Sequence, residues 1–351
     1  MGEMKNALKN LKQDAYQEYK DLPRPNKKES LSYFGRCVFY SLKLILTEKE
    51  IITFSLLQLV CIGLGYYAWV QMLGWIPEEV WESTRHSDSG SSADIVLLLW
   101  SFFCVGLVTY PLGILTACMG AAHFLHENGE ESTIAKCLRI VLPRAWPIWI
   151  FSWIDGCWTV NRIVERLPKK NDRVSFSQKA INEAIYQAWK IASLGVLPAL
   201  IIGRGIMDSC CDSLGVLKTH FKSICQLRIA YSVICWIIGI ASYVGCIFMV
   251  PYIISHMSSE NDMYTVYMIV GIPIIIALFF IHVLFRPIYI LSACRIYSQY
   301  VRENNIPIVL PTVSKFSSTV VVFLILAVII GSVFLFKDAL GITEYLAVPY
   351  K

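Results

Sequence analysis

The chain has 351 residues, of which 56% are hydrophobic and only 16% are charged. A soluble domain carries about 25% charged residues, so this composition excludes a water-soluble globular protein. The net charge is +5. The 20 glycines and 14 prolines form no sustained repeat, which excludes fibrous and low-complexity chains. We therefore expect an all-α integral membrane protein built as a polytopic helical bundle.

The N-terminal 1–30 is polar and rich in lysine, and we expect it to form a cytoplasmic segment. It holds no short apolar run followed by small residues, so the sequence does not predict a cleaved leader. Ten of the chain's 31 basic residues precede residue 51. In a membrane protein this excess is typical of a cytoplasmic side that faces anionic lipid, and nothing in the sequence suggests a nucleic-acid surface.

Five stretches without Asp, Glu, Lys or Arg are long enough to be transmembrane helices. About 20 residues at 1.5 Å each cover roughly 30 Å of hydrocarbon. The five stretches are 51–76, 95–122, 229–255, 263–285 and 316–336. The last of them, within a C-terminal region 308–351, adds a helix and a short tail to a polytopic domain at 31–307.

Lysine and arginine in the connecting segments predict the orientation. The segments 77–94 and 256–262 contain almost no basic residues and belong outside. The chain before residue 51 and the segments 127–144, 218–228 and 286–315 are basic and belong in the cytoplasm. The N-terminus is therefore expected inside.

The middle of the chain, 127–228, is basic and amphipathic and follows other rules. Its apolar stretches 145–154 and 191–203 have only ten and thirteen uncharged residues. If both crossed, the basic linker between them would lie outside, against the positive-inside rule. We therefore expect two short embedded helices, re-entrant or interfacial, that leave the linker in the cytoplasm. Five cations are expected to face lipid there: Arg162, Arg166, Lys169, Lys170 and Arg173.

Tryptophan gathers at the first short stretch. Trp146, Trp149, Trp153 and Trp158 lie within thirteen residues, and the first three share one helical face. Since tryptophan prefers the headgroup boundary, the cluster favours an interfacial helix. The alternative is an aromatic stripe that packs into the bundle.

A glycine turn follows the second short stretch. Gly203 and Gly205 flank Arg204, and an amphipathic helix with Asp208 in its first turn comes next. Its apolar positions recur every three or four residues, as an amphipathic helix requires. They are Met207, Cys210, Cys211, Leu214, Leu217, Phe221 and Ile224.

The stretch 197–208, LPALIIGRGIMD, followed by Ser213 and Leu217, resembles the central signature of a family of bacterial polytopic membrane proteins of unknown function. The resemblance extends over about 31–307. Further similarities lie at 34–36, Ser41, Leu42, 46–50, Tyr297 and Pro307. It implies a compact helical domain in the bacterial inner membrane and brings no known reaction with it. Departures from the pattern lie at Ser55, His123, His126, Cys211 and Asp212, so a ligand of the family's basic positions does not transfer.

No catalytic or nucleotide-binding motif is present, so we expect neither an enzyme nor a resident cofactor. One weak candidate for a metal site is a single helical face that carries His123, His126, Glu127 and Glu130. Imidazole and carboxylate ligands suit zinc or iron. A solvated polar face is the preferred interpretation, because the group lies at the cytoplasmic boundary.

Ionisable residues at membrane depth are costly and therefore informative. Asp155 and Arg204 end the two short stretches, so an ion pair between them, joined by Asp208, would form a polar pocket. Such a pair could lock the fold or line a ligand path. Arg286 is expected to reach the cytoplasmic face, and His282 to lie in the core.

Two functions remain. The favoured one is a non-enzymatic membrane protein that binds lipid, above all anionic lipid, or partner proteins including a second copy of itself. The alternative is a small-solute transporter or channel that uses the broken helices around Asp155 and Arg204.

Overall fold

The computed structural model describes residues 30–73, 92–166, 176–256, 262–308 and 310. All regular structure in these ranges is helical, which confirms the predicted all-α class. The predicted N-terminal segment up to residue 29 and the predicted helix at 316–336 lie outside the described residues.

The first three helices are α2 (Ser30–Thr47), α3 (Lys49–Leu73) and α5 (Ser92–Glu127). Helices α2 and α3 meet at Glu48, whose backbone N–H donates to the Leu44 carbonyl at 2.8 Å. Helix α5 continues through Pro111 without interruption. Bilayer helices tolerate such a proline when neighbouring groups satisfy the freed carbonyl.

The basic middle folds into five helical elements before the long helix α10 begins. They are α6 (Ile134–Val141), a 3-10 turn (Leu142–Arg144), α7 (Ala145–Arg166), α8 (Phe176–Ala192) and α9 (Val196–Ile201). Thr133 caps α6, because its side chain accepts a hydrogen bond from the Lys136 backbone N–H.

The last part of the described chain consists of long apolar rods. They are α10 (Ile206–His256), α11 (Asp262–Phe280), a π-helical turn (Ile281–Phe285) and α12 (Arg286–Glu303). Helix α10 has 51 residues and is kinked at His220, where φ is −117° and ψ is 25°.

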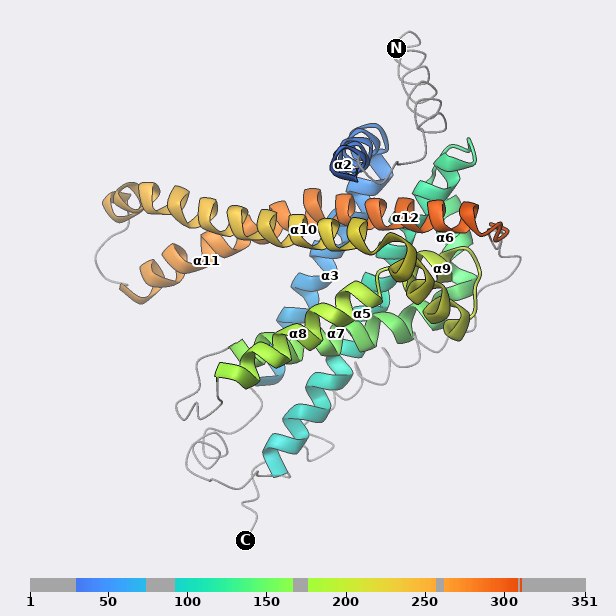
Figure 1. Ribbon diagram of the computed structural model, residues 1–351. Coiled ribbons are helices and arrows are strands. Elements are labelled where there is room, and N and C mark those ends of the chain that lie inside the picture. Colours follow the sequence, from blue (N-terminus) through green and yellow to red (C-terminus); the bar gives the residue numbers. More distant parts are fainter. Residues whose placement is uncertain (1–29, 74–91, 167–175, 257–261, 309, 311–351) are drawn as a thin grey trace.

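Helices α10 and α11 pack against each other and leave a common junction on one side, and α3, α5 and α7 pack against one another and leave it on another (Figure 1). Helix α8 packs on α10 and is joined to α7 by side-chain hydrogen bonds. Buried side chains of α2, α6, α9 and α12, together with the adjoining ends of α3 and α5, form the junction. Its core includes Phe54, Phe124, Leu200 and Tyr297, each at most 1% exposed. The junction therefore fixes where each group of helices begins.

Five helical segments in the described ranges are long and apolar enough to cross a membrane. They are Lys49–Tyr67, Ser101–Glu127, Ala180–Ile201, Ile206–Phe248 and Gly271–Glu303. Four of them overlap predicted transmembrane stretches, and the chain is an integral membrane protein.

The prediction that the two middle stretches are too short is wrong in its bounds. Helix α7 continues through Asp155 to Arg166 and has 22 residues. The second stretch joins α8, and Ala180–Ile201 reaches the length and hydropathy of a transmembrane segment. The prediction took charged residues as the limits of each stretch, but a charged side chain does not end a helix. Asp155 and Lys190 lie inside α7 and α8 and pair with each other. The linker 167–175, with Lys169, Lys170 and Arg173, lies outside the described residues.

The tryptophan cluster serves helix packing. The Trp149 indole N–H donates to the Gly106 carbonyl of α5 at 2.7 Å, and that of Trp153 donates to the Phe102 carbonyl at 3.1 Å. Glycine at position 106 leaves room for the Trp153 ring, because a Cβ there would lie 2.6 Å from it. Trp149 and Trp153 therefore pack into the bundle, as the aromatic-stripe interpretation expects.

Candidate functional site

Polar residues form matching stripes on α7 and α8. Asp155, Thr159 and Arg162 lie at i, i+4 and i+7 on α7, and Glu183, Gln187 and Lys190 repeat that spacing on α8. Residues at these spacings share one face of a helix. Because the helices run in opposite directions, the acidic end of one stripe meets the basic end of the other.

The inner ion pair joins Asp155 and Lys190. The Lys190 ammonium lies 2.6 Å from Asp155 Oδ1 and donates a second hydrogen bond to the Thr159 hydroxyl at 3.1 Å. The Trp189 indole N–H also donates to Asp155 Oδ1, at 3.1 Å. The Asp155 side chain is 32% exposed and that of Lys190 only 15%. The pair is held tightly and still borders open space.

The outer ion pair connects this hairpin to α10. Arg162 binds a carboxylate oxygen of Glu183 through two guanidinium nitrogens. The Gln187 amide donates to the other oxygen of Glu183 at 2.6 Å, and its own carbonyl accepts from Arg228 Nε at 3.0 Å. A continuous chain of hydrogen bonds therefore runs from α7 through α8 to α10.

Two further residues close the site from α12. Arg286 is half-buried and donates to His282 Nδ1 at 3.2 Å and to the Thr116 hydroxyl at 3.5 Å. Neither of these acceptors is a carboxylate. Asp155 is near enough for its charge to act on Arg286. Tyr289 of α12 is hydrogen-bonded to Arg228 of α10.

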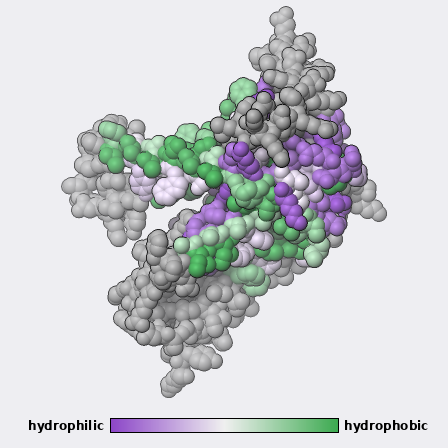
Figure 2. Space-filling view, viewed as in Figure 1, coloured by the Kyte–Doolittle hydropathy of each residue, from purple (hydrophilic) through white to green (hydrophobic). Residues whose placement is uncertain are grey.

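We call the cluster of Asp155, Gln187, Lys190, Arg228 and Arg286 the polar furrow. Among the described residues the cluster holds three cations and one carboxylate, a formal charge of +2, and the neutral pair of Arg162 and Glu183 does not change this sum. Lys190 binds Asp155, whereas Arg228 and Arg286 bind neutral acceptors. Figure 2 shows hydrophilic surface at the inner end of the notch between α10 and α8, with apolar surface on both sides. Excess positive charge beside apolar surface favours an anion.

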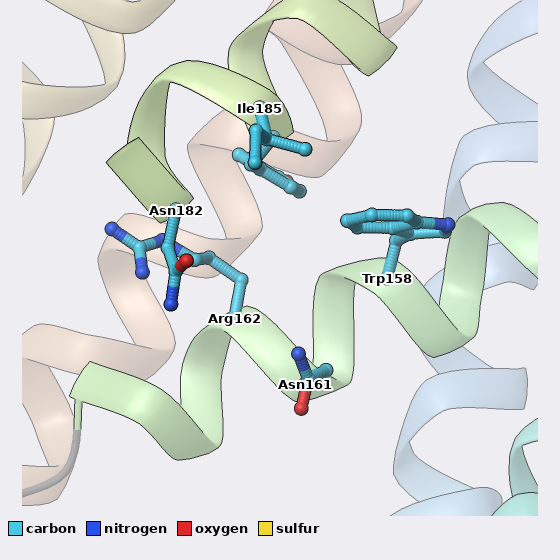
Figure 3. A pocket seen from close by; sticks show the side chains of 6 residues that line it. Trp158, Asn161, Arg162, Asn182 and Ile185 are labelled. Carbon is cyan, nitrogen blue, oxygen red and sulfur yellow. The ribbon is translucent and has the colours of Figure 1, made fainter. Parts of the chain in front are cut away.

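A cavity of about 130 Å³ adjoins the furrow between α7 and α8. Figure 3 shows Trp158 of α7 on one side of it, with Arg162 and Asn182 on the other. Asn161, Ile185 and Tyr186 complete the lining. The Lys190 ammonium lies 5.5 Å from the centre of the Tyr186 ring, so the cavity and the furrow share a wall. Stacking surface and amide groups suit an uncharged polar molecule.

The predicted pair between Asp155 and Arg204 is wrong. Arg204 Nε instead donates to Asp212 Oδ2 at 2.9 Å, and the Tyr297 hydroxyl donates to the same oxygen at 3.1 Å. This hydrogen bond to Asp212 raises the pKa of Arg204. The cause is the turn at Gly203, where φ is +93°, which directs Arg204 toward the first turns of α10 rather than toward α7.

Asp208 does not complete a pocket with Asp155 or Arg204. It is exposed in the first turn of α10, near Gly205. The Gly203 carbonyl accepts a hydrogen bond from Arg144 at 2.6 Å, so the predicted glycine turn is present and is fixed from outside α10. The ion pair on which the predicted polar pocket depended is therefore absent between Asp155 and Arg204.

The four residues of the weak metal candidate do not form one ligand set in the described part of the chain. Glu127 lies 3.7 Å from His123 but binds Ser298 and Arg302. His126 lies 3.9 Å from Glu48 of α3. Glu130 forms an exposed pair with Lys136 at 3.3 Å. Among the described residues no group of three His, Cys, Asp or Glu side chains could hold a metal ion.

Of the five cations predicted to face lipid, the side chain of Arg162 is described. It is only 12% exposed and pairs with Glu183. Arg162 is therefore not a free lipid-facing cation. Arg166 ends α7, and its side chain lies outside the described part of the chain, as do Lys169, Lys170 and Arg173.

Sequence reasoning missed Lys190, Gln187 and Arg228. The matching i, i+4, i+7 stripes of α7 and α8 were the available signal for the first two. Arg228 gave no local signal, because its partner Gln187 lies 41 residues away.

Comparisons of the chain with protein-family models, with characterised proteins and with solved structures find no match.

Proposed function

We propose that this protein binds an anionic phospholipid, whose phosphate occupies the polar furrow. The observation that carries the proposal is the furrow's formal charge of +2 between apolar walls. A phosphate group accepts several charge-assisted hydrogen bonds, and its acyl chains are compatible with the surrounding apolar helices.

The position of the cations along the sequence supports a headgroup. Arg228 immediately precedes the apolar stretch 229–255, and Arg286 immediately follows the apolar stretch 263–285. Arginine at the end of a transmembrane stretch lies where lipid phosphates lie. The furrow therefore opens at headgroup level for the pair α10 and α11.

The adjoining cavity supports a headgroup with an uncharged polar part. Its lining by Trp158, Tyr186 and Asn182 offers an aromatic face and an amide beside the cationic furrow. A glycerol or sugar hydroxyl group fits this chemistry, whereas a second phosphate does not, since Arg162 is already neutralised by Glu183.

The proposal includes a location. The basic segments before residue 51 and at 127–144 and 218–228 favour a cytoplasmic junction and an N-terminus inside. The resemblance to bacterial polytopic membrane proteins favours the bacterial inner membrane. The protein takes no part in catalysis in this proposal and acts by binding lipid, alone or with protein partners.

The test is native mass spectrometry of the purified protein after titration with phosphatidylglycerol and with phosphatidylcholine. We expect retained phosphatidylglycerol in the unaltered protein, about fivefold weaker retention in Arg228→Gln or Arg286→Gln, and a larger loss in the double variant. The magnitude follows from about 1 kcal/mol for each cation near an anionic headgroup.

The matched control is Arg139→Gln, which removes an exposed arginine of α6 outside the furrow. It is expected to retain lipid like the unaltered chain. Equal retention of both lipids, or equal losses in the control and the furrow variants, would refute specific binding at the furrow.

A further inference from the structure

The first part of α10 buries several polar side chains and exposes several apolar ones. Ser209, Asp212 and Ser213 are at most 7% exposed, whereas Met207 is 79% and Phe221 is 58% exposed. Leu214 is also exposed, on the same apolar stripe. Several polar side chains of this segment thus face the protein, while an apolar stripe of Met207, Leu214 and Phe221 faces away from it.

Hydrogen bonds fix this inverted orientation. The Ser213 hydroxyl donates to the Ala192 carbonyl at 2.5 Å and accepts from the Gly195 backbone N–H at 3.0 Å. Asp212 accepts hydrogen bonds from Arg204 and Tyr297. Rotation of the helix to hide its apolar stripe would break these bonds, so the stripe needs an external apolar cover.

The length of α10 indicates what covers the stripe. Its 51 residues extend for about 77 Å at 1.5 Å each, far more than the roughly 30 Å of a bilayer's hydrocarbon. Exposed apolar residues continue past the kink at His220 to Ile229, Val233 and Trp236, on the part of α10 that crosses the membrane. The stripe is therefore continuous with lipid-facing surface.

Charge on the same segment agrees with lipid as the cover. Lys218 and Lys222 are exposed on either side of the kink, and basic residues that flank an apolar stripe favour anionic headgroups. At the kink, His220 Nε2 lies 3.3 Å from a carboxylate oxygen of Glu303 in α12. The kink allows one helix to change direction at the membrane surface.

We infer that residues 206–219 form an interfacial arm, which lies along the cytoplasmic bilayer surface with Met207, Cys211 and Leu214 in the acyl-chain boundary. The kink at His220 turns the chain from this surface into the bilayer. The arm is a membrane contact separate from the polar furrow.

Spin labels test the arm in a cysteine-free background reconstituted in anionic nanodiscs. A label at Leu214→Cys is expected to collide several-fold more with oxygen, which dissolves in lipid, than with a water-soluble nickel chelate. Labels at the matched controls Glu130→Cys and Lys136→Cys, exposed residues of the junction, are expected to show the opposite preference. Greater access of the nickel chelate at Leu214 would overturn the inference.

A second copy of the chain is the competing cover. Dipolar broadening between two Leu214 labels would show that cover and overturn the inference, whereas its absence at one protein per nanodisc, together with oxygen access, supports lipid. The same labels in the Arg228→Gln and Arg286→Gln double variant are expected to give unchanged values. A negative lipid-retention test would therefore not contradict the interfacial arm. A negative spin-label test at Leu214 would not contradict lipid binding at the polar furrow.

Discussion

Glu127 and Glu130 lie three residues apart and have opposite environments. The Glu127 side chain is 2% exposed and binds the Ser298 hydroxyl at 2.5 Å as well as Arg302. That of Glu130 is 54% exposed and pairs with the exposed Lys136. The carboxylate of Glu127 thus joins α5 to α12 inside the junction, whereas Glu130 joins nothing across the fold.

Replacement of Glu127 is therefore expected to destabilise the protein. Glu127→Ala leaves Ser298 and Arg302 without their acceptor and should lower the free energy of unfolding by about 2 to 3 kcal/mol, reduced because Arg302 is half exposed. Glu130→Ala should change it by less than about 0.5 kcal/mol. Chemical denaturation in mixed micelles measures both, and equal effects of the two changes would contradict the assignment.

Thiol reactivity separates two classes of cysteine. Cys137 of α6 is buried, and burial, aided by the carboxylates of Glu50 and Glu48, raises its pKa to about 12. Its thiol keeps its proton in the folded state at pH values at which the unfolded chain releases it. Any stability that it contributes is thus present at neutral pH and lost as pH rises toward that value.

Alkylation with N-ethylmaleimide between pH 7 and 9 is accordingly expected to spare Cys137 and to modify Cys210, which is exposed. Peptide mass spectrometry gives the modified fraction of each. Denaturation should make Cys137 as reactive as the others. Rapid modification of Cys137 in the folded protein would show that α6 opens.

At the scale of elements, glycines set the distance between α5 and α7. A Cβ at Gly106 would lie 2.6 Å from the Trp153 ring, and one at Gly156 would lie 2.6 Å from Thr109 Cγ2. Ser152 approaches Gly113 in the same way. Small residues at such contacts let helix backbones approach closely in a membrane.

Gly156→Val is expected to force the two helices apart and to lower the free energy of unfolding by about 1 to 3 kcal/mol. The control is Gly239→Val in α10, where a Cβ meets nothing within 4 Å. Thermal unfolding followed by tryptophan fluorescence compares them, because Trp149 and Trp153 lie at the affected contact. A larger effect at Gly239 would contradict the tight contact.

The same scale shows what sequence reasoning reaches. Uncharged length located four of the transmembrane segments, because α3, α5, α10 and α11 have no charge in their apolar stretches. It missed Ala180–Ile201, where Lys190 interrupts the uncharged run but is paired with Asp155 of α7. A charge count treats each residue alone and cannot register a partner 35 residues away.

Across the described part of the molecule, hydrophilic surface is prominent at the junction and apolar surface along α10 and α11 (Figure 1, Figure 2). Local patterns predicted helices and the turn at Gly203, but the partner of Arg204 depended on the direction in which that turn sends the chain. The residues of the polar furrow come from α7, α8, α10 and α12, so they become neighbours only when these four helices assemble.

Orientation is the prediction that belongs to this scale. Single cysteines at Glu130, Lys136 and Asn304, all exposed at the junction, should resist an impermeant maleimide in intact cells and react after permeabilisation. The reason is the positive-inside distribution of the basic segments. Labelling in intact cells would place the junction outside and reverse the proposed topology.

The π-helical turn at Ile281–Phe285 holds one residue more than an α-helical turn of the same rod. Deletion of a single codon there would convert the rod into regular α-helix, while α11 and α12 keep the faces that they present to their neighbours. His282 and Arg286 would lose their present spacing, and with it the hydrogen bond between the imidazole and the guanidinium. One additional amino acid in the rod is thus enough to set His282 beside Arg286 while the two flanking helices keep their packing.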